Sequence, residues 1–270
     1  MKPDRRIDWD AWEKLSSWQL TSVDGLVLLG STAEAMLLSD QEITEMSQRI
    51  AAWQTAKPLI VGVGHASTEQ VISQSKTFDD LNVAAYMVVV PYYLRPSQQG
   101  MINHFRAIAD ASARPVMLYN VPGRCGASLD VASIHVLARH PNIIALKDAD
   151  ARIERLDQIR AGVNSDFLIF SGDDAATQSL IQRGGHGVIS VVSNVVPSLS
   201  QYVVQQWLNG QDDSEKSAQW RQWIQAVEVA SNPIGVKGCL ALMGYGSGEC
   251  RPPLERMTGQ QEALMRTLML

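Results

Sequence analysis

Lys147 is the residue of this sequence whose position best suits covalent chemistry. It directly follows the apolar run 142–146, so it would stand at the carboxyl end of a buried strand. Burial at such a place lowers the pKa of a lysine ammonium group and leaves the neutral amine that attacks a ketone. The alternative is a lysine that only forms an ion pair with Asp148 or Asp150 at a strand end. Position alone leaves both interpretations open.

Three hydroxyl-bearing residues stand at other predicted strand ends. Tyr119 ends the strand before that of Lys147, where its phenol could give or accept a proton. A packed tyrosine with its hydroxyl group in water is the alternative. Ser31 and Thr32 follow Gly30, and their hydroxyl and N–H groups could hold a carboxylate, unless this segment is a plain turn.

The remaining polar clusters suggest structure more than chemistry. Asp173 and Asp174 follow Gly172 at another strand end, and they are interpreted as the start of a helix, whose positive end favours acidic residues. The glycine-rich segment 184–187 is interpreted as a turn into the next strand. The five histidines show no metal-ligand spacing, so no metal site is expected. The three cysteines form no CxxC pair and are expected to be free thiols.

Seven short apolar runs are the predicted strands that position these groups. They are continuously apolar rather than alternating, as strands covered on both faces require, and amphipathic helical segments separate them. This repeated order predicts an α/β fold, either a (β/α)8 barrel or a doubly wound sheet. Enzymes with such barrels carry their reactive groups at the carboxyl ends of the strands. The runs are 25–30, 59–63, 85–90, 116–119, 143–147, 167–171 and 187–192.

The pattern divides the chain into residues 1–195, predicted to form the barrel, and residues 196–270, predicted to complete it and to add a C-terminal helical subdomain. A barrel of this class needs eight strands, and only seven are predicted. Residues 7–20 are helix-like, and their natural place is after a strand that the sequence does not contain. We therefore expect the first strand of the barrel to be missing from this chain.

Composition narrows the range of partners. The net charge is −5 and no long basic run is present, which argues against a nucleic-acid partner. The first residues are charged and aromatic, unlike a signal peptide, and no apolar run reaches membrane-spanning length. We expect a cytoplasmic protein with neither a membrane nor a nucleic acid as partner.

Six motifs occur in the order in which one enzyme family carries them, and together they span most of residues 20–240. The sequence resembles the 4-hydroxy-tetrahydrodipicolinate synthase family, long called dihydrodipicolinate synthases. The motifs are GSTAEA (30–35), PYYLRPSQQG (91–100), LYNVPGRCG (118–126), IIALKDA (143–149), SGDDA (171–175) and GGHGVISVVSNV (184–195).

The resemblance implies a (β/α)8 TIM barrel with a C-terminal helical subdomain, assembled as a homo-oligomer, either a dimer or a tetramer. It also implies a lyase with a class I aldolase mechanism. Pyruvate forms a Schiff base with Lys147, and its enamine attacks the aldehyde of L-aspartate 4-semialdehyde in diaminopimelate and lysine biosynthesis. No cofactor is implied, because the protonated imine is itself the electron sink.

Individual roles follow from the same resemblance. Tyr119, Ser31 and Tyr93 match a relay of hydroxyl groups, in which serine replaces the usual threonine and a neighbouring subunit supplies Tyr93. Serine keeps the relay oxygen and loses the methyl group that stiffens threonine, so a modest effect on rate is expected. The positions that match substrate-binding residues are Thr32, Ile189, Gly172 and, for the carboxylate of the semialdehyde, Arg124.

Two other functions stay open. N-acetylneuraminate lyases and keto-deoxy sugar-acid aldolases share the lysine and the tyrosine, but Arg124 within NVPGR favours the dipicolinate reaction. A degenerate, non-catalytic paralogue is the second alternative, because the first strand is missing. Lysine feedback is expected to be weak or absent, since the matching allosteric positions lack an acidic partner for the lysine ammonium group and an amide for its carboxylate. These positions are Ala35, Met36, Asp40, Ile43, Ala66 and Gln70, with only Tyr92 kept.

Overall fold

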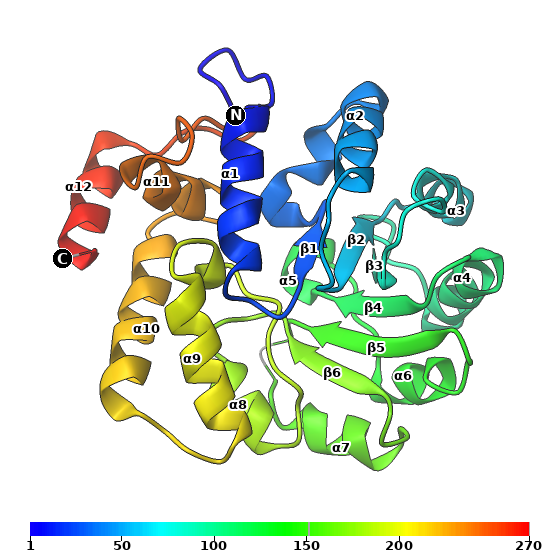
Figure 1. Ribbon diagram of the computed structural model, residues 1–270. Coiled ribbons are helices and arrows are strands. Elements are labelled where there is room, and N and C mark those ends of the chain that lie inside the picture. The colour runs from blue at the N-terminus through cyan, green and yellow to red at the C-terminus, as the bar shows by residue number, and fades with distance from the viewer. Residues whose placement is uncertain (151, 270) are drawn as a thin grey trace. The chain divides into compact units, whose positions relative to one another are not determined.

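The computed structural model describes residues 1–150 and 152–269 (Figure 1). Their contacts group them into two compact units. The first unit combines Met1–Leu38 with Ser190–Leu270, and the second unit is the continuous stretch Ser39–Ile189. The predicted division at residue 195 rests on sequence pattern rather than on contacts, and it stays a prediction.

Parallel strands form the centre of the second unit. Neighbours in the chain are neighbours in the sheet, and each pair is parallel, so the carboxyl ends of the strands meet at one edge. These strands confirm five of the predicted runs. They are β2 (Leu59–Val63), β3 (Ala85–Val89), β4 (Val116–Asn120), β5 (Ile143–Asp148) and β6 (Leu168–Ser171).

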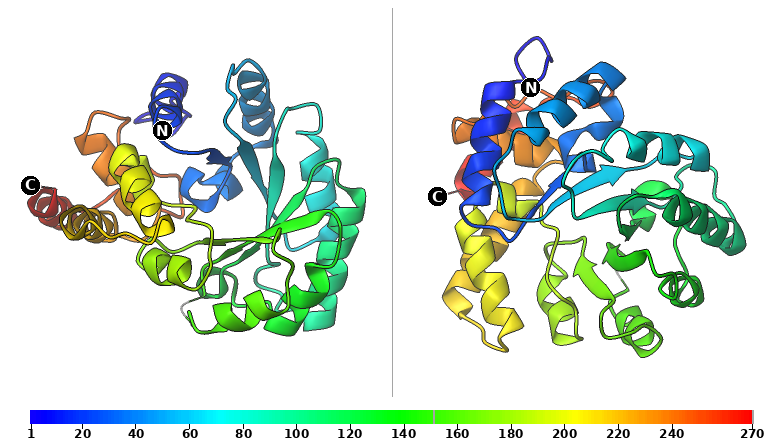
Figure 2. Two further views of the ribbon diagram at one scale, coloured as in Figure 1. Left: turned by 60° about the horizontal axis from the view of Figure 1, so that its bottom comes forward. Right: turned by 45° about the vertical axis from the view of Figure 1, so that its right-hand side comes forward.

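The helices between these strands pack on one another on the outer side of the sheet (Figure 2): α3 on α4, α4 on α6, and α6 on α7. Tyr86, Val88, Val116 and Leu118 are completely buried. Strands buried on both faces need apolar residues throughout, which explains the continuous runs. The described helices of this unit are α2 (Asp40–Ala51), α3 (Thr68–Lys76), α4 (Gln98–Ala111), α5 (Pro122–Cys125), α6 (Val131–Leu137), α7 (Arg155–Ala161) and α8 (Thr177–Gln182).

The strand predicted over residues 187–192 is wrong. Its pairing is limited to one parallel bridge between Val188 and Ser171. Gly187, directly before the bridge, takes a φ of +133°, which lies outside the β region of regular strands and which residues with a Cβ atom disfavour. Beyond the bridge the chain enters the 3-10 helix η3 (Val192–Asn194). A run of branched apolar residues favours a strand, but a ladder also needs extended backbone on both sides of each bridge.

The first unit is mainly helical. Its strand, β1 (Leu26–Leu28), confirms the predicted run 25–30 in shortened form, and α1 (Trp9–Leu20) confirms the helix predicted over residues 7–20. The helices after residue 196 confirm the helical character predicted for the C-terminal part, and α10 packs on α9, α11 and α12. The helices are α9 (Pro197–Leu208), α10 (Ser214–Val227), α11 (Ile234–Leu242) and α12 (Gly259–Leu268).

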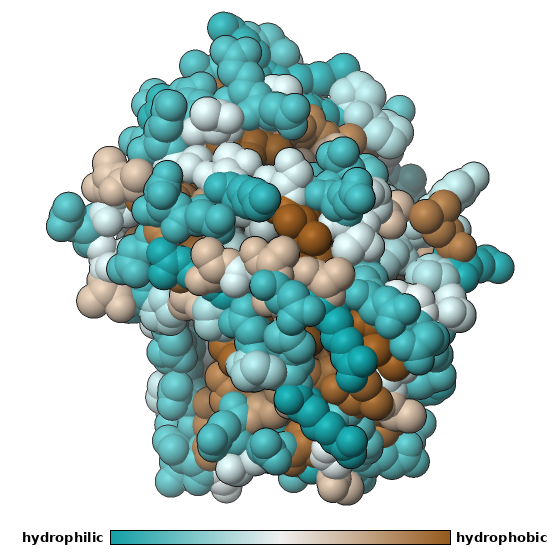
Figure 3. All heavy atoms as spheres, turned by 90° about the vertical axis from the view of Figure 1, so that its right-hand side faces the viewer, coloured by the Kyte–Doolittle hydropathy of each residue, from teal (hydrophilic) through white to brown (hydrophobic). Residues whose placement is uncertain are grey.

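Hydrophobic side chains also reach the surface. On the face drawn in Figure 3 they form separate brown areas among hydrophilic residues. Single exposed apolar residues are ordinary on folded proteins. Tyr93 and Leu94 are adjacent, however, and they are 88% and 63% exposed.

Candidate active site

Lys147 and Tyr119 are neighbours at the ends of β5 and β4. The sheet register pairs one with the other, so both side chains leave the sheet on the same face. The Lys147 Nζ atom lies 4.2 Å from the centroid of the Tyr119 ring. Only 9% of Lys147 and 7% of Tyr119 is exposed. The ring shields the amine from water and offers its protonated form a cation–π contact.

Burial lowers the pKa of Lys147 from 10.5 to about 8. The negative charge of Asp174 acts in the opposite direction, and the positive charge of Arg124 lowers the pKa of Lys147 further. At pH 8 about half of such side chains carry a neutral amine, against about 0.3% for a lysine in water. The site therefore holds a nucleophilic amine close to neutral pH.

The carboxylates that follow Lys147 in the sequence are engaged elsewhere. Asp148 Oδ1 accepts a hydrogen bond from Asn120 Nδ2 at 2.7 Å. Asp150 Oδ2 accepts from Arg155 at 2.7 Å and from Arg152 at 2.6 Å. These contacts favour the interpretation of Lys147 as a reactive amine over the interpretation as an ion-pair partner of these two acids.

Gly172 lies beside the stem of Lys147. A Cβ atom at this position would be 2.8 Å from the Ala149 Cβ atom and 3.1 Å from the Lys147 Cε atom, so glycine leaves the space that the lysine side chain occupies. The Gly172 N–H donates to the Asp148 carbonyl at 2.7 Å, and the Ile189 N–H donates to the Ser171 carbonyl at 2.9 Å. Gly172 and Ile189 are thus anchored at the strand ends next to the lysine.

Asp174 is a site residue that the sequence interpretation missed. It is 8% exposed, and it is the first group to oppose the lowered pKa of Lys147. The helix predicted to start at Asp173 and Asp174 is present but begins later, since α8 starts at Thr177 with Ala176 as its N-cap and the two acids lie in the turn before it. Asp173 closes a local turn by accepting the Ala175 N–H at 2.9 Å. The signal for Asp174 was its place just after a strand end, as for Lys147.

Arg124 stands on the one-turn helix α5, directly after β4. Pro122 starts this helix, and Gly126 ends it with a φ of +66°, donating its N–H to the Pro122 carbonyl at 3.0 Å. Proline at a helix start and glycine after its end are the residues that suit these places. Arg124 is exposed, and its charge acts on Lys147. An exposed guanidinium near a buried amine suits the capture of a carboxylate.

Tyr93 stays on the surface of its own chain. Its side chain is 88% exposed, and its φ of +73° places the backbone in the left-handed region. Such a conformation in a non-glycine residue costs about 1–3 kcal/mol and often marks a functional segment. Its N–H donates to the Cys125 carbonyl at 3.2 Å, which ties the segment to the end of α5. The structure does not bring Tyr93 to Lys147 within one chain.

Ser31 and Thr32 belong to the first unit, in the 3-10 helix η1 (Ser31–Ala33). Thr32 Oγ1 accepts a hydrogen bond from Asn232 Nδ2 at 3.0 Å. Glu34 follows them in the left-handed region, where it is buried, forms an ion pair with Lys237 and accepts the Arg251 N–H at 2.7 Å. The roles of Ser31 and Thr32 in a reaction stay predictions.

Within residues 1–150 and 152–269, no group of three or more histidine, cysteine, aspartate or glutamate side chains is arranged to hold a metal ion. None of the helices in the described part of the chain combines the length and the apolar character of a membrane span.

The site defines an α/β protein with a buried amine at the end of a parallel strand. The chain belongs to the dihydrodipicolinate synthetase family, whose match runs over residues 1–269. A curated relative, the 4-hydroxy-tetrahydrodipicolinate synthase of Xanthomonas axonopodis pv. citri, is 36% identical over 98% of this chain and 89% of its own length. Relatives with this name are lyases.

Two solved structures are similar over nearly the whole chain. A monomeric dihydrodipicolinate synthase variant has a TM-score of 0.93 and 32% identity, with 97% of this chain and 90% of that chain covered. The chloride-inhibited dihydrodipicolinate synthase from Acinetobacter baumannii, complexed with pyruvate, also has a TM-score of 0.93 and 32% identity, with 100% and 94% covered.

Proposed function

We propose that this chain is a Schiff-base lyase that condenses pyruvate with L-aspartate 4-semialdehyde to 4-hydroxy-tetrahydrodipicolinate. The observation that carries the proposal is Lys147, a buried amine with a pKa of about 8 against the ring of Tyr119. Family membership and relatives named as 4-hydroxy-tetrahydrodipicolinate synthases support the choice of substrates.

The reaction begins at the neutral amine of Lys147. Its lone pair attacks the ketone carbon of pyruvate, and loss of water gives a protonated imine. The imine withdraws electrons, so a proton leaves the methyl carbon and an enamine forms. The enamine carbon attacks the aldehyde carbon of the semialdehyde and forms a carbon–carbon bond. The amino group of the semialdehyde then attacks the imine carbon, which closes the ring and releases Lys147.

The proton transfers in this sequence need hydroxyl groups close to the amine. Tyr119 stands against Lys147, and we assign it the first transfer, with Ser31 and Tyr93 completing the relay. The exposure of Tyr93 supports its delivery to the site of a neighbouring copy, so activity requires at least a homodimer and permits a tetramer. Thr32, Ile189 and Gly172 hold pyruvate in this proposal.

Arg124 receives the carboxylate of the semialdehyde. This assignment rests on its exposed guanidinium at the end of β4 and on the fork geometry with which arginine binds carboxylates. It separates the dipicolinate reaction from those of N-acetylneuraminate lyase and keto-deoxy sugar-acid aldolases, whose polyhydroxyl substrates need a different loop.

Two finer features belong to the same proposal. The strands are part of a (β/α) barrel, which the consecutive parallel order of β2 to β6 and the TM-scores of 0.93 support. Lysine inhibits the enzyme weakly or not at all, because Ala35, Met36 and Ile43 occupy positions of the family's feedback pocket. An inhibition constant for lysine in the micromolar range would contradict this expectation.

Reductive trapping tests the central step. Incubation with pyruvate and borohydride should add about 72 Da to Lys147, as expected for a reduced imine, and Lys147→Ala should gain no mass at any site. A coupled assay with aspartate semialdehyde then measures turnover. Absence of the adduct in the unchanged protein would overturn the proposal, and an adduct without turnover of the semialdehyde or of any sugar acid would favour the degenerate paralogue.

A further inference from the structure

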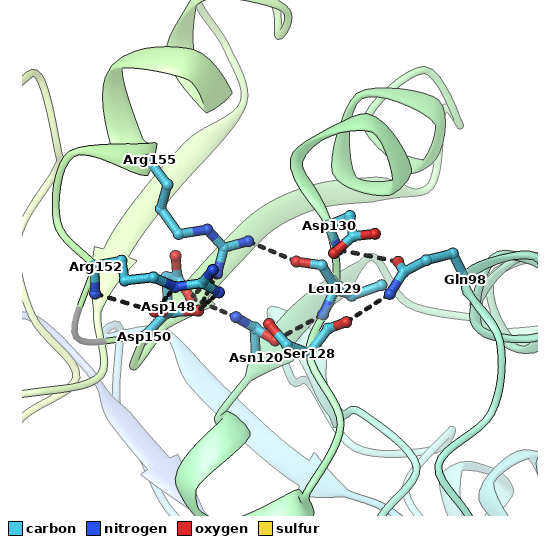
Figure 4. Close-up of polar contacts among 9 residues, drawn as sticks. All are labelled: Gln98, Asn120, Ser128, Leu129, Asp130, Asp148, Asp150, Arg152 and Arg155. Carbon is cyan, nitrogen blue, oxygen red and sulfur yellow. Dashed lines mark hydrogen bonds and ion pairs between the residues drawn. The ribbon is translucent and has the colours of Figure 1, made fainter.

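A buried polar network begins at the ends of the two strands that carry the reactive pair (Figure 4). Asn120 follows Tyr119 in β4, Asp148 follows Lys147 in β5, and the register pairs these two residues as well. Because successive side chains of a strand point to opposite faces, Asn120 and Asp148 point away from Tyr119 and Lys147. Asn120 Nδ2 donates to Asp148 Oδ1 at 2.7 Å, which joins the strand ends.

The network continues to a segment that is remote in sequence. Asn120 Oδ1 accepts the Leu129 N–H at 3.0 Å. Arg155, at the start of α7, donates to the Leu129 carbonyl at 2.5 Å and to Asp150 at 2.7 Å, and it lies 3.6 Å from Asp148 Oδ1. Both backbone polar groups of Leu129 are therefore held by side chains from β4 and α7.

A second side chain holds the same segment from α4. Gln98 Nε2 donates to the Ser128 carbonyl at 2.8 Å, and Gln98 Oε1 accepts the Asp130 N–H at 3.0 Å. The same oxygen accepts the Ser133 hydroxyl at 2.7 Å. We name residues 128–130, with Asn120, Arg155 and Gln98 around them, the loop clamp (Figure 4).

The loop clamp is built from groups that are costly to leave without partners. Asn120 is completely buried, Asp148 is 8% exposed and Arg155 is 7% exposed. Burial raises the pKa of Asp148, and the positive charge of Arg155 and the Asn120 hydrogen bond lower it again. Such networks hold one geometry when every member is satisfied.

Residues 128–130 end the loop that leaves α5, the helix that carries Arg124. The other end of α5 continues from β4. The Cys125 carbonyl at the end of α5 accepts the N–H of Tyr93. The position of Arg124 is thus set by the strand before it and by the loop clamp a few residues after it.

We infer that Arg155 and Gln98 are positioning residues for the second substrate. They fix residues 128–130, and through them they hold Arg124 where it captures the carboxylate of the incoming aldehyde. Imine formation is left to the opposite face of the strands. This inference rests on the proposed function, because it assigns Arg124 to the semialdehyde.

Arg155→Lys is the main test. It keeps the positive charge between Asp148 and Asp150, but one ammonium group cannot replace the guanidinium fork that reaches Asp150 and the Leu129 carbonyl together. The KM for aspartate semialdehyde should rise by about tenfold, because displacement of a binding group by about 1 Å has effects of this size or larger. Pyruvate trapping on Lys147 and the KM for pyruvate should stay within about twofold.

Gln98→Met releases the clamp from the other side with little change of volume, so the inference does not depend on one variant. It should raise the KM for the semialdehyde in the same selective way. Arg152→Ala is the matched control. Arg152 also bonds Asp150, but its side chain is 66% exposed and its hydrogen bonds run to Asp150 instead of to the loop. It should leave both KM values within about twofold.

The outcomes separate the possible failures. A KM for the semialdehyde within twofold of the unchanged protein in both variants would overturn the inference. The variants could instead weaken pyruvate and semialdehyde binding equally and lower the Tm. This result would assign the network a purely structural role and would also overturn the inference. If the unchanged protein forms no pyruvate adduct, the proposed function fails before the clamp variants are compared.

Discussion

The pH dependence of pyruvate trapping is the sharpest prediction for the site. The pKa of Lys147 falls from 10.5 to about 8, which corresponds to about 3 kcal/mol of destabilisation of the charged form. At pH 7 about a tenth of the Lys147 side chains are then neutral, against about 0.03% for a lysine in water. When attack by the amine limits trapping, Lys147 should react at pH 7 about 300-fold faster than a lysine of unchanged pKa.

The assay is the initial rate of adduct formation with pyruvate and cyanoborohydride between pH 6 and 10, followed by intact mass. Nα-acetyl-lysine, measured in parallel, removes the pH dependence of the reductant. The midpoint should lie near pH 8. Asp174→Asn should move it lower, because the Asp174 carboxylate holds the proton on Lys147. A midpoint above about 9.5 for the unchanged protein would show that burial does not set the amine's reactivity.

Two further predictions concern Lys147 and the space around it. Lys147→Met should raise the free energy of unfolding in urea by about 1–3 kcal/mol at pH 7, because the charged amine is costly to bury. The pKa of Lys147 is lower in the folded protein than in the unfolded protein. The gain in unfolding free energy should therefore be largest below pH 8 and vanish as the pH approaches 10.5. A gain that grows with pH would contradict the lowered pKa of Lys147. Gly172→Ala should slow pyruvate trapping at least about tenfold, because its Cβ atom would collide with Ala149 and crowd Lys147, whereas trapping within twofold would show that the site yields easily.

The strands could be predicted because burial on both faces leaves a simple record in the sequence. The run 143–147 became β5, and the run 116–119 became β4, each within one residue of its end. The failure at 187–192 has a local cause, since composition favours a strand while the φ of Gly187 does not. A glycine's freedom cannot be seen in the letter itself, because glycine adopts extended and left-handed backbone equally well.

The site could be predicted only in part. Lys147 and Tyr119 ended adjacent strands, and parallel strands bring their carboxyl ends together, so their proximity followed from topology. The effect of Asp174 on Lys147 was missed because acids between a strand and a helix are typical of helix starts, and α8 does begin three residues later. Nothing in the sequence indicated the contacts of Arg155. It bonds the carbonyl of Leu129, 26 positions away, and a backbone carbonyl is present at every position of any sequence.

The arrangement of the ends of β4 and β5 explains how the reactive amine of Lys147 is held in a rigid position. An amine that must lose its proton cannot be held by strong ionic contacts, because these would raise its pKa. Lys147 is therefore placed by its backbone and by the ring of Tyr119, and the two strand ends are joined on their other face by the hydrogen bond between Asn120 and Asp148. Because successive side chains of a strand point to opposite faces of the sheet, adjacent residues can serve different functions. The carboxylate of Asp148 is thus kept one residue, and one sheet face, away from the amine that must lose its proton.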